Sequence, residues 1–144
     1  MPVRIRIPDR RRMLAMLAGA VAVFAGRRAA ALTPQQQPFV DQAFAMKRQA
    51  ELAGDQAYGA VVVRGEEIVG FGPSRVVVKG DWNAHAEREA IRDAQKKLGS
   101  PDLTGCVLYS TSRPCAACER AAAQARIARM YFGADATDAG APKS

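Results

Sequence analysis

The side chains in this sequence that are best suited to chemistry are a histidine, a glutamate and two cysteines. The single histidine, His85, is followed two residues later by Glu87, and further along the chain Pro114 precedes the pair Cys115 and Cys118. Imidazole and thiolate groups are preferred zinc ligands, and three protein ligands leave a fourth position open for water. Because the two cysteines are three residues apart, one helical turn can aim both sulfurs at one point. We therefore predict one Zn²⁺ per chain, held by His85, Cys115 and Cys118.

Glu87 is the candidate for acid–base catalysis beside this metal. A His-x-Glu followed later by Pro-Cys-x-x-Cys is the signature described for zinc-dependent nucleobase deaminases, in which the glutamate moves protons and does not bind the metal. The alternative is a solvated glutamate in a first helical turn, where negative charge is favourable. The position of Glu87 two residues after a predicted ligand favours catalysis.

Longer segments around these residues resemble a known family. The stretch 84–109, AHAEREAIRDAQKKLGSPDLTGCVLY, is similar to the cytidine deaminase-like superfamily, and most similar to its guanine deaminase and tRNA-adenosine deaminase branch. The segments YGAV at 58–61, ARI at 125–127 and YFGA at 131–134 also resemble that branch, so the resemblance covers about residues 39–135. It implies a cytidine deaminase-like fold and hydrolytic deamination, in which zinc activates a water, Glu87 relays its proton and ammonia leaves.

The resemblance also suggests which residues contact the substrate. We expect these to be Ala60, Ser74, Trp82, Ala86 and Arg113. Ser74 stands where the family usually has an asparagine, and it lacks the paired donor and acceptor of an amide. Arg113 stands where the family usually has a glutamate; it either favours a substrate with an acidic group or is an exposed loop residue. Trp82 either stacks on a base or serves packing.

Hydrophobic periodicity indicates the elements that must position these residues. The predicted order is helix, hairpin, helix, strand, helix, strand. The predicted ranges are 39–53, 58–63 with 68–71, 86–98, 103–110, 115–127 and 129–132. Strands that alternate with helices imply parallel pairing in the later part of the chain. We predict an α/β fold, a three-layer α/β/α sandwich with a mixed sheet of four or five strands.

Several local features complete this prediction. The run Val76–Val78 is expected to extend the second strand past a break, and Asp81 or Asn83 to cap the following helix. Cys106 is expected to be a small core residue. After residue 132 we expect a small polar tail, C-terminally short relative to the resembling branch, so that the pocket is more open or is closed by a second subunit.

Residues 1–31 have the three parts of an export signal. A basic start is followed by an uncharged run at 13–26 and by a small-residue cleavage site at 29–31. Arg10 and Arg11, followed after one residue by Met13-Leu14, are typical of the twin-arginine route. We therefore predict a periplasmic or secreted protein whose functional domain is 32–144. The alternatives are an uncleaved membrane anchor and a cytoplasmic protein with a wrongly assigned start.

Composition and charge exclude several classes of protein. With 144 residues, 49% of them hydrophobic, the chain fits one globular domain and not a disordered protein, and three cysteines are too few for a disulfide scaffold. The net charge of +7 lies mostly in the leader, because residues 32–144 carry 14 Lys and Arg against 13 Asp and Glu. We therefore expect a small-molecule substrate, no nucleic-acid partner and no stable membrane span after signal removal. A homodimer is compatible with the sequence.

The leading functional interpretation is a zinc-dependent hydrolase that deaminates a free nucleobase, nucleoside or similar small aminated heterocycle. A second is a non-catalytic, zinc-binding relic of the fold that acts as a binding or scaffold module, which the changes at Ser74 and Arg113 support. The intact Glu87 argues against it. A third, a thiol–disulfide protein, leaves His85 and Glu87 unexplained.

Overall fold

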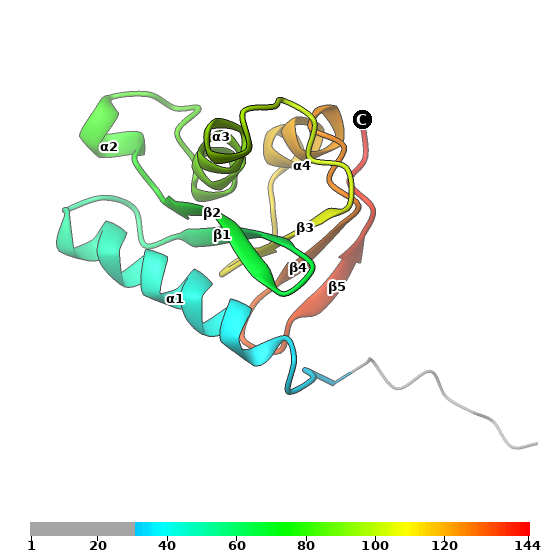
Figure 1. Cartoon of the computed structure of the whole chain (residues 1–144). Coiled ribbons are helices and arrows are strands. Elements are labelled where there is room, and N and C mark those ends of the chain that lie inside the picture. The colour runs from blue at the N-terminus through cyan, green and yellow to red at the C-terminus, as the bar shows by residue number, and fades with distance from the viewer. Residues whose placement is uncertain (1–30) are drawn as a thin grey trace, which may run out of the picture.

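The structure is a computed structural model that describes residues 31–144, which form three layers (Figure 1). A five-stranded sheet has α1 on one face and α3 and α4 on the other, so the predicted α/β/α architecture is confirmed. The elements are α1 Gln37–Leu52, β1 Gly59–Arg64, β2 Glu67–Pro73, α2 Val76–Lys79, α3 Ala86–Leu98, β3 Cys106–Ser110, α4 Ala116–Gln124, β4 Arg129–Phe132 and β5 Thr137–Gly140. The predicted export signal lies outside the described residues except for Ala31.

The strand order in the sheet is β2-β1-β3-β4-β5. Only β3 and β4 are parallel, and α4 connects them, whereas the other neighbours pair antiparallel. The sheet is therefore mixed, as predicted. The connection that carries the two cysteines begins at the carboxyl end of β3, which is where ligand-binding loops of α/β sheets usually lie.

Alternating side chains of the central strands build a core on each face of the sheet. On β1, Ala60 and Val62 belong to the cluster under α3 and α4, whereas Val61 and Val63 belong to the cluster under α1. This period of two is that of a strand buried on both faces, and it explains the nearly continuous apolar run in the sequence. Cys106 is buried in the first of these clusters, as expected.

The approach of α3 to the sheet depends on small residues. A Cβ atom at Gly72 would overlap the carbonyl oxygen of Ala86 and the backbone nitrogen of Ala90, and one at Gly70 would overlap the carbonyl oxygen of Ala90. Ala86, Ala90 and Ala94 are fully buried on the facing side of α3. Glycine on the strand and alanine on the helix therefore bring α3, which begins with Glu87 in its first turn, close to β2.

Two local predictions were wrong. The run Val76–Val78 forms the short helix α2, because β2 ends at Pro73 and the chain then turns away, leaving Val77 and Val78 exposed. Neither Asp81 nor Asn83 caps α3, since Asp81 instead accepts the Asn83 N–H within the preceding turn at 2.8 Å.

The segment after residue 132, predicted as a small polar tail, contains a further strand. It reverses direction and adds β5 antiparallel to β4. Asp138 on β5 forms an ion pair with Arg129 on β4, with the Arg129 Nη2 atom 2.8 Å from a carboxylate oxygen. None of the helices within residues 31–144 is both long and apolar enough to cross a membrane.

Candidate metal centre and active-site cavity

The predicted ligands lie at the starts of two helices. His85 is the N-cap residue of α3 and Cys115 is the N-cap residue of α4, and both have extended backbone conformations. Cys118 follows in the first turn of α4. N-cap positions favour Ser, Thr, Asp and Asn, whose side chains bind the free backbone N–H groups, yet neither His85 nor Cys115 makes such a bond. The capping positions are thus occupied by ligand side chains.

The three ligand side chains converge. The Nδ1 atom of His85 lies 3.4 Å from the Sγ atom of Cys118 and 3.7 Å from that of Cys115. Around a tetrahedral zinc ion, bond lengths of ~2.3 Å to sulfur and ~2.0–2.1 Å to nitrogen place these atoms about 3.6 Å apart. All three ligand atoms lie within 4.8 Å of one another. The donor set and its spacing therefore fit one zinc ion, and a sulfur-containing set favours zinc over magnesium or calcium.

The pKa values of Cys118 and Glu87 are also those of buried acidic groups that a bound cation would stabilise in ionised form. Burial raises the pKa of the Cys118 thiol, and the neighbouring Glu87 raises it further. Burial likewise raises the pKa of Glu87 itself. A metal ion reverses this, because the thiolate is the ligand form and a nearby divalent cation stabilises it. The buried Cys118 thiol and Glu87 carboxyl group therefore lie close enough together for one bound cation to stabilise the ionised form of each.

Glu87 stands beside the ligands. Its Oε2 atom lies 3.6 Å from the Sγ atom of Cys118, and the residue is only 6% exposed. The first turn of α3 brings it there, since His85 is the N-cap residue and Glu87 the second residue of the helix. A buried carboxylate next to the metal ligands is placed for proton transfer and does not resemble the solvated glutamate of the alternative interpretation.

A cavity of about 610 Å³ opens beside these residues. It is lined by the α1–β1 connection, the segment after β2, the start of α3 and the loop between β3 and α4. The lining residues are Gln56, Ala57, Tyr58, Ser74, Trp82, His85, Ala86, Glu87, Ser112, Arg113 and Cys115. The volume lies within the ~300–1,000 Å³ typical of small-ligand sites.

Most of the predicted substrate contacts reach this cavity. Ser74, Trp82, Ala86 and Arg113 all line it, and the Trp82 side chain is 82% exposed. Ala60 does not line it, because its side chain faces α3 and is fully buried in the core. The guanidinium of Arg113 lies over the Phe132 ring, 5.5 Å from its centroid.

Sequence reasoning missed four lining residues, namely Gln56, Ala57, Tyr58 and Ser112. Tyr58 begins the YGAV segment at 58–61, whereas the predicted contact Ala60 lies two residues later, where the alternation of β1 directs its side chain to the core. Ser112 follows β3 in a loop held against β1, since the Thr111 N–H donates to the Gly59 carbonyl oxygen at 2.9 Å. The alternation of side chains along β1 could have identified Tyr58, and the position of the turn after β3 could have identified Ser112.

The comparison with known families settles what this site belongs to. The model of the cytidine and deoxycytidylate deaminase zinc-binding region matches residues 33–134. This chain belongs to that zinc-binding deaminase family. The match spans His85, Glu87 and both ligand cysteines, so the family and the geometry identify zinc as the cofactor.

Relatives of this deaminase-family chain differ in their named activities. The guanine deaminase of Bacillus subtilis is 40% identical over 82 residues, which cover 57% of this chain and 53% of that one. Its solved structure superposes with a TM-score of 0.64 at 35% identity, covering 67% of this chain and 62% of that one. The tRNA-specific adenosine deaminase of Agrobacterium fabrum is 36% identical over 106 residues, covering 74% of this chain and 70% of that one.

Some relatives are much longer than the matched region. The tRNA(Ile)-lysidine synthase of Deinococcus deserti is 41% identical over 101 residues, which cover 69% of this chain but only 19% of that protein. This chain also spans only about half of the Bacillus enzyme. Similarity therefore shows the deaminase family and fold, and the substrate is a separate question.

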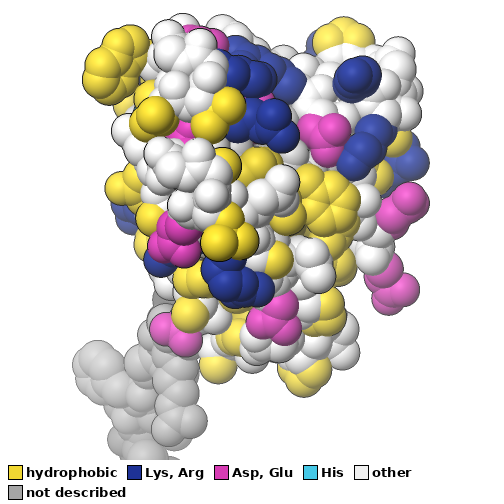
Figure 2. Space-filling model, turned by 90° about the vertical axis from the view of Figure 1, so that its left-hand side faces the viewer, with side chains coloured by type: hydrophobic (Ala, Val, Ile, Leu, Met, Phe, Trp, Pro, Cys, Tyr) yellow, Lys and Arg dark blue, Asp and Glu magenta, His cyan; other side chains and the backbone are white. Residues whose placement is uncertain are grey.

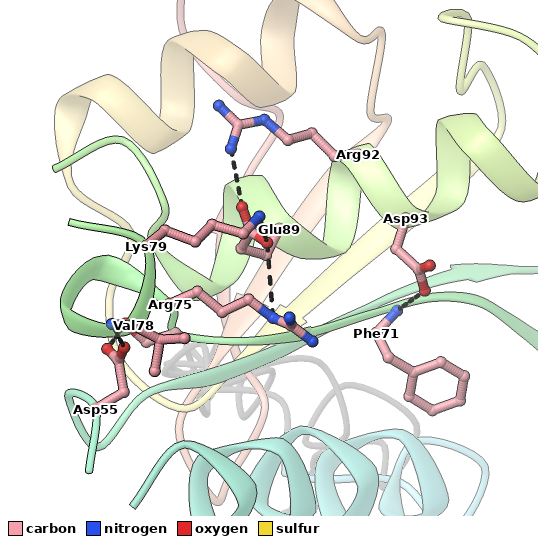
Figure 3. Close-up of polar contacts among 9 residues, drawn as sticks. Asp55, Phe71, Arg75, Val78, Lys79, Glu89, Arg92 and Asp93 are labelled. Atoms are coloured by element: carbon pink, nitrogen blue, oxygen red, sulfur yellow. Dashed lines mark hydrogen bonds and ion pairs between the residues drawn. The ribbon is translucent and has the colours of Figure 1, made fainter. Parts of the chain in front are cut away.

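In the present protein, a buried glutamate on α3 forms ion pairs with one wall of the cavity. Glu89, 8% exposed, forms ion pairs with Lys79 and Arg92 at 2.8 Å each and with Arg75 at 3.8 Å (Figure 3). Arg75 is the N-cap residue of α2 and Lys79 is the last residue of that helix, within the segment 74–82, which supplies the lining residues Ser74 and Trp82. Glu89 thus holds that segment against the helix that carries the catalytic candidate.

Proposed function

We propose that this protein hydrolytically deaminates a free nucleobase, nucleoside or similar small aminated heterocycle and releases ammonia. The observation that carries the proposal is Glu87, a buried carboxylate that lies beside the His85–Cys115–Cys118 cluster and lines the cavity. A purely structural zinc site has no need of such a group. The cavity volume suits a molecule the size of a nucleobase or nucleoside.

The roles of the residues follow from their places. A zinc ion bound by His85, Cys115 and Cys118 supplies Lewis acidity and an activated water. Glu87 accepts the proton of the attacking water and delivers protons to the ring nitrogen and the leaving amine. Because its carboxyl group is buried, the proton passes to the reacting atoms and is not lost to solvent. Trp82 presents an aromatic face at the cavity on which a heterocycle can stack.

A second candidate is deamination of adenosine in tRNA. It is favoured by the similarity to the Agrobacterium tRNA-specific adenosine deaminase. The charge balance speaks for the small substrate, since residues 32–144 are nearly neutral. On the face in Figure 2, basic side chains gather in one small patch near the top and otherwise lie among acidic and hydrophobic ones, so that they form no continuous basic surface across the face. Phosphate-backbone binding depends on such a surface.

Ammonia release separates these candidates. Zinc-loaded protein is incubated with guanine, cytosine, adenine, their nucleosides, aminated pterins and triazines, and with a tRNA anticodon stem–loop. Turnover of a small heterocycle but not of the RNA is the expected result. Turnover of the RNA alone would replace the proposal with the second candidate. Absence of all turnover from folded, zinc-loaded protein would favour the non-catalytic binding module.

We also propose that the protein is exported by the twin-arginine route. The support is the leader sequence at 1–31 together with the chemistry of the site, since two reduced thiols that reach an oxidising compartment before folding are open to disulfide formation. Export after folding around zinc avoids this. Replacing Arg10 and Arg11 by lysine is expected to retain the protein in the cytoplasm. Continued export of that variant would contradict the proposal.

A further inference from the structure

One wall of the cavity carries a hydroxyl group with a fixed partner. Ser74 lines the cavity but is only 2% exposed, and its Oγ atom donates a hydrogen bond to Oδ1 of Asp55 at 3.0 Å. Asp55 also accepts the Gln56 N–H at 2.7 Å and, through Oδ2, the Val78 N–H of α2 at 2.8 Å (Figure 3). Both carboxylate oxygens are therefore engaged, and Ser74 itself borders the cavity.

The end of α1 places Asp55 at this wall. Gly54 has a left-handed backbone, with a φ of +75°, and its N–H donates to the Glu51 carbonyl oxygen. The Asp55 N–H reaches back to the Ala50 carbonyl oxygen at 2.9 Å. These two bonds form a Schellman motif, the usual way in which a glycine ends a helix. The position of Asp55 is thus set by the helix end and does not depend on a flexible loop.

The charge of Asp55 determines the polarity of Ser74. Partial burial raises the pKa of Asp55, but the hydrogen bonds from Val78, Gln56 and Ser74 outweigh that effect and lower it. The ionised carboxylate only accepts hydrogen bonds, so the single hydroxyl proton of Ser74 must point toward Asp55. The Ser74 oxygen then offers only lone pairs to the cavity.

We propose that Asp55 is a positioning residue that fixes Ser74 as a hydrogen-bond acceptor, so that the cavity selects heterocycles that present a ring N–H or amino donor to this wall. An asparagine at position 74 would offer both a donor and an acceptor and would impose no such selection. A ligand that brings only a lone pair to the wall meets the lone pairs of Ser74 and leaves both groups unpaired. This inference rests on the proposed function, because it describes how the same cavity recognises its substrate.

The test measures binding and turnover separately on the zinc-loaded, full-length protein. The probes are guanine and its 1-, 7- and 9-methyl derivatives, in each of which a methyl group stands where guanine or one of its tautomers carries a ring N–H. Dissociation constants are measured by calorimetry, and ammonia release is measured in parallel. Loss of one neutral hydrogen bond corresponds to roughly a tenfold loss of affinity. We expect one methyl derivative to bind about tenfold more weakly than guanine to the wild type.

The variants separate hydrogen-bond polarity from bulk. Ser74→Ala removes the acceptor, whereas Asp55→Ala keeps the Ser74 side chain and frees its proton; both are expected to reduce the discrimination to about threefold or less. Asp55→Asn is a gentler variant, expected to give an intermediate value. Asp102→Ala is the matched control, because Asp102 also accepts a backbone N–H and a hydroxyl, both from Thr104, but does not line the cavity. It should retain the wild-type discrimination.

The outcomes are distinguishable. Discrimination that persists in both Asp55 variants, or that is absent from the wild type, overturns the inference even if guanine is turned over. Discrimination that depends on Asp55 without any ammonia release supports the inference and contradicts the proposed function. No binding of any probe overturns the inference, whereas the proposed function is then decided by ammonia release from the wider substrate panel.

Discussion

The substitution Gly72→Ala tests whether the close approach of α3 to β2 sets the geometry of the metal centre. The added Cβ would overlap the Ala86 carbonyl oxygen and would lie 2.9 Å from the Ala90 Cβ, whereas ordinary contacts begin at 3.4 Å. Relief of the second contact alone requires a displacement of about 0.5 Å, and relief of the backbone overlap requires more. Because α3 is a rigid helix whose first turn carries Glu87, its N-terminus must move with it.

The magnitude follows from overpacking. Extra atoms in a well-packed core typically cost ~1–3 kcal/mol, and the backbone overlap places Gly72→Ala toward the upper end. A displacement of His85 relative to the cysteines on α4 should also lower zinc affinity, by about tenfold if it resembles the loss of a supporting contact around a metal ligand. The two effects should appear together.

Urea denaturation and competition with a zinc chelator measure these two quantities. Gly65→Ala is the matched control, since Gly65 also has a special conformation, with a φ of +63°, but an added Cβ there would meet nothing within 4 Å. Its left-handed backbone should cost ~1–2 kcal/mol in stability while zinc affinity stays unchanged. The reasoning is refuted if Gly72→Ala loses stability but binds zinc as tightly as the wild type.

Three further results are expected. Cys118→Ser should reduce the zinc content from one per chain and remove the stabilisation by zinc, whereas Cys106→Ser should retain the metal; mass spectrometry of the native protein checks both. Glu89→Gln should lower the free energy of unfolding by about 1–2 kcal/mol, less than for a fully buried pair because its partners are half-exposed, and faster hydrogen exchange in α2 should accompany it. The Arg129 guanidinium lowers the pKa of Asp138, so the ion pair stabilises β5 above the ordinary aspartate pKa and loses this effect as pH falls through the lowered value; Arg129→Gln should raise that pKa in an NMR titration. An unchanged Asp138 titration would contradict the last expectation.

The metal centre was predictable because its ligands lie in two short sequence motifs. His85 and Glu87 open one helix and Cys115 and Cys118 open another, and the two motifs in this order form a signature that indicates a common site. The three-layer fold was predictable for a similar reason, since strand and helix periodicities differ and alternate along the chain. The signature and the resemblance to the deaminase superfamily suggested the role of Glu87, and the family match shows the family.

The features that were not predictable depend on the environment created by folding. A run of three valines favours a strand, yet Val76–Val78 belong to the helix α2. Asp55 accepts an N–H in the first turn of this helix, and Glu89 binds Arg75 and Lys79 at its two ends. The capping rule failed at α3 because His85 occupies the N-cap position as a metal ligand. Local propensity is often overridden at functional sites in this way.

The central claim is that Glu87 acts as the proton carrier of a zinc-dependent deaminase. Its most direct test is ammonia release by zinc-loaded Glu87→Gln, compared with the wild type and with Glu119→Gln, which changes a glutamate in the first turn of α4. The account predicts that the Glu87 variant keeps one zinc per chain and loses turnover by at least about 10²-fold, whereas the Glu119 variant retains it. Turnover that survives in zinc-loaded Glu87→Gln would contradict the account.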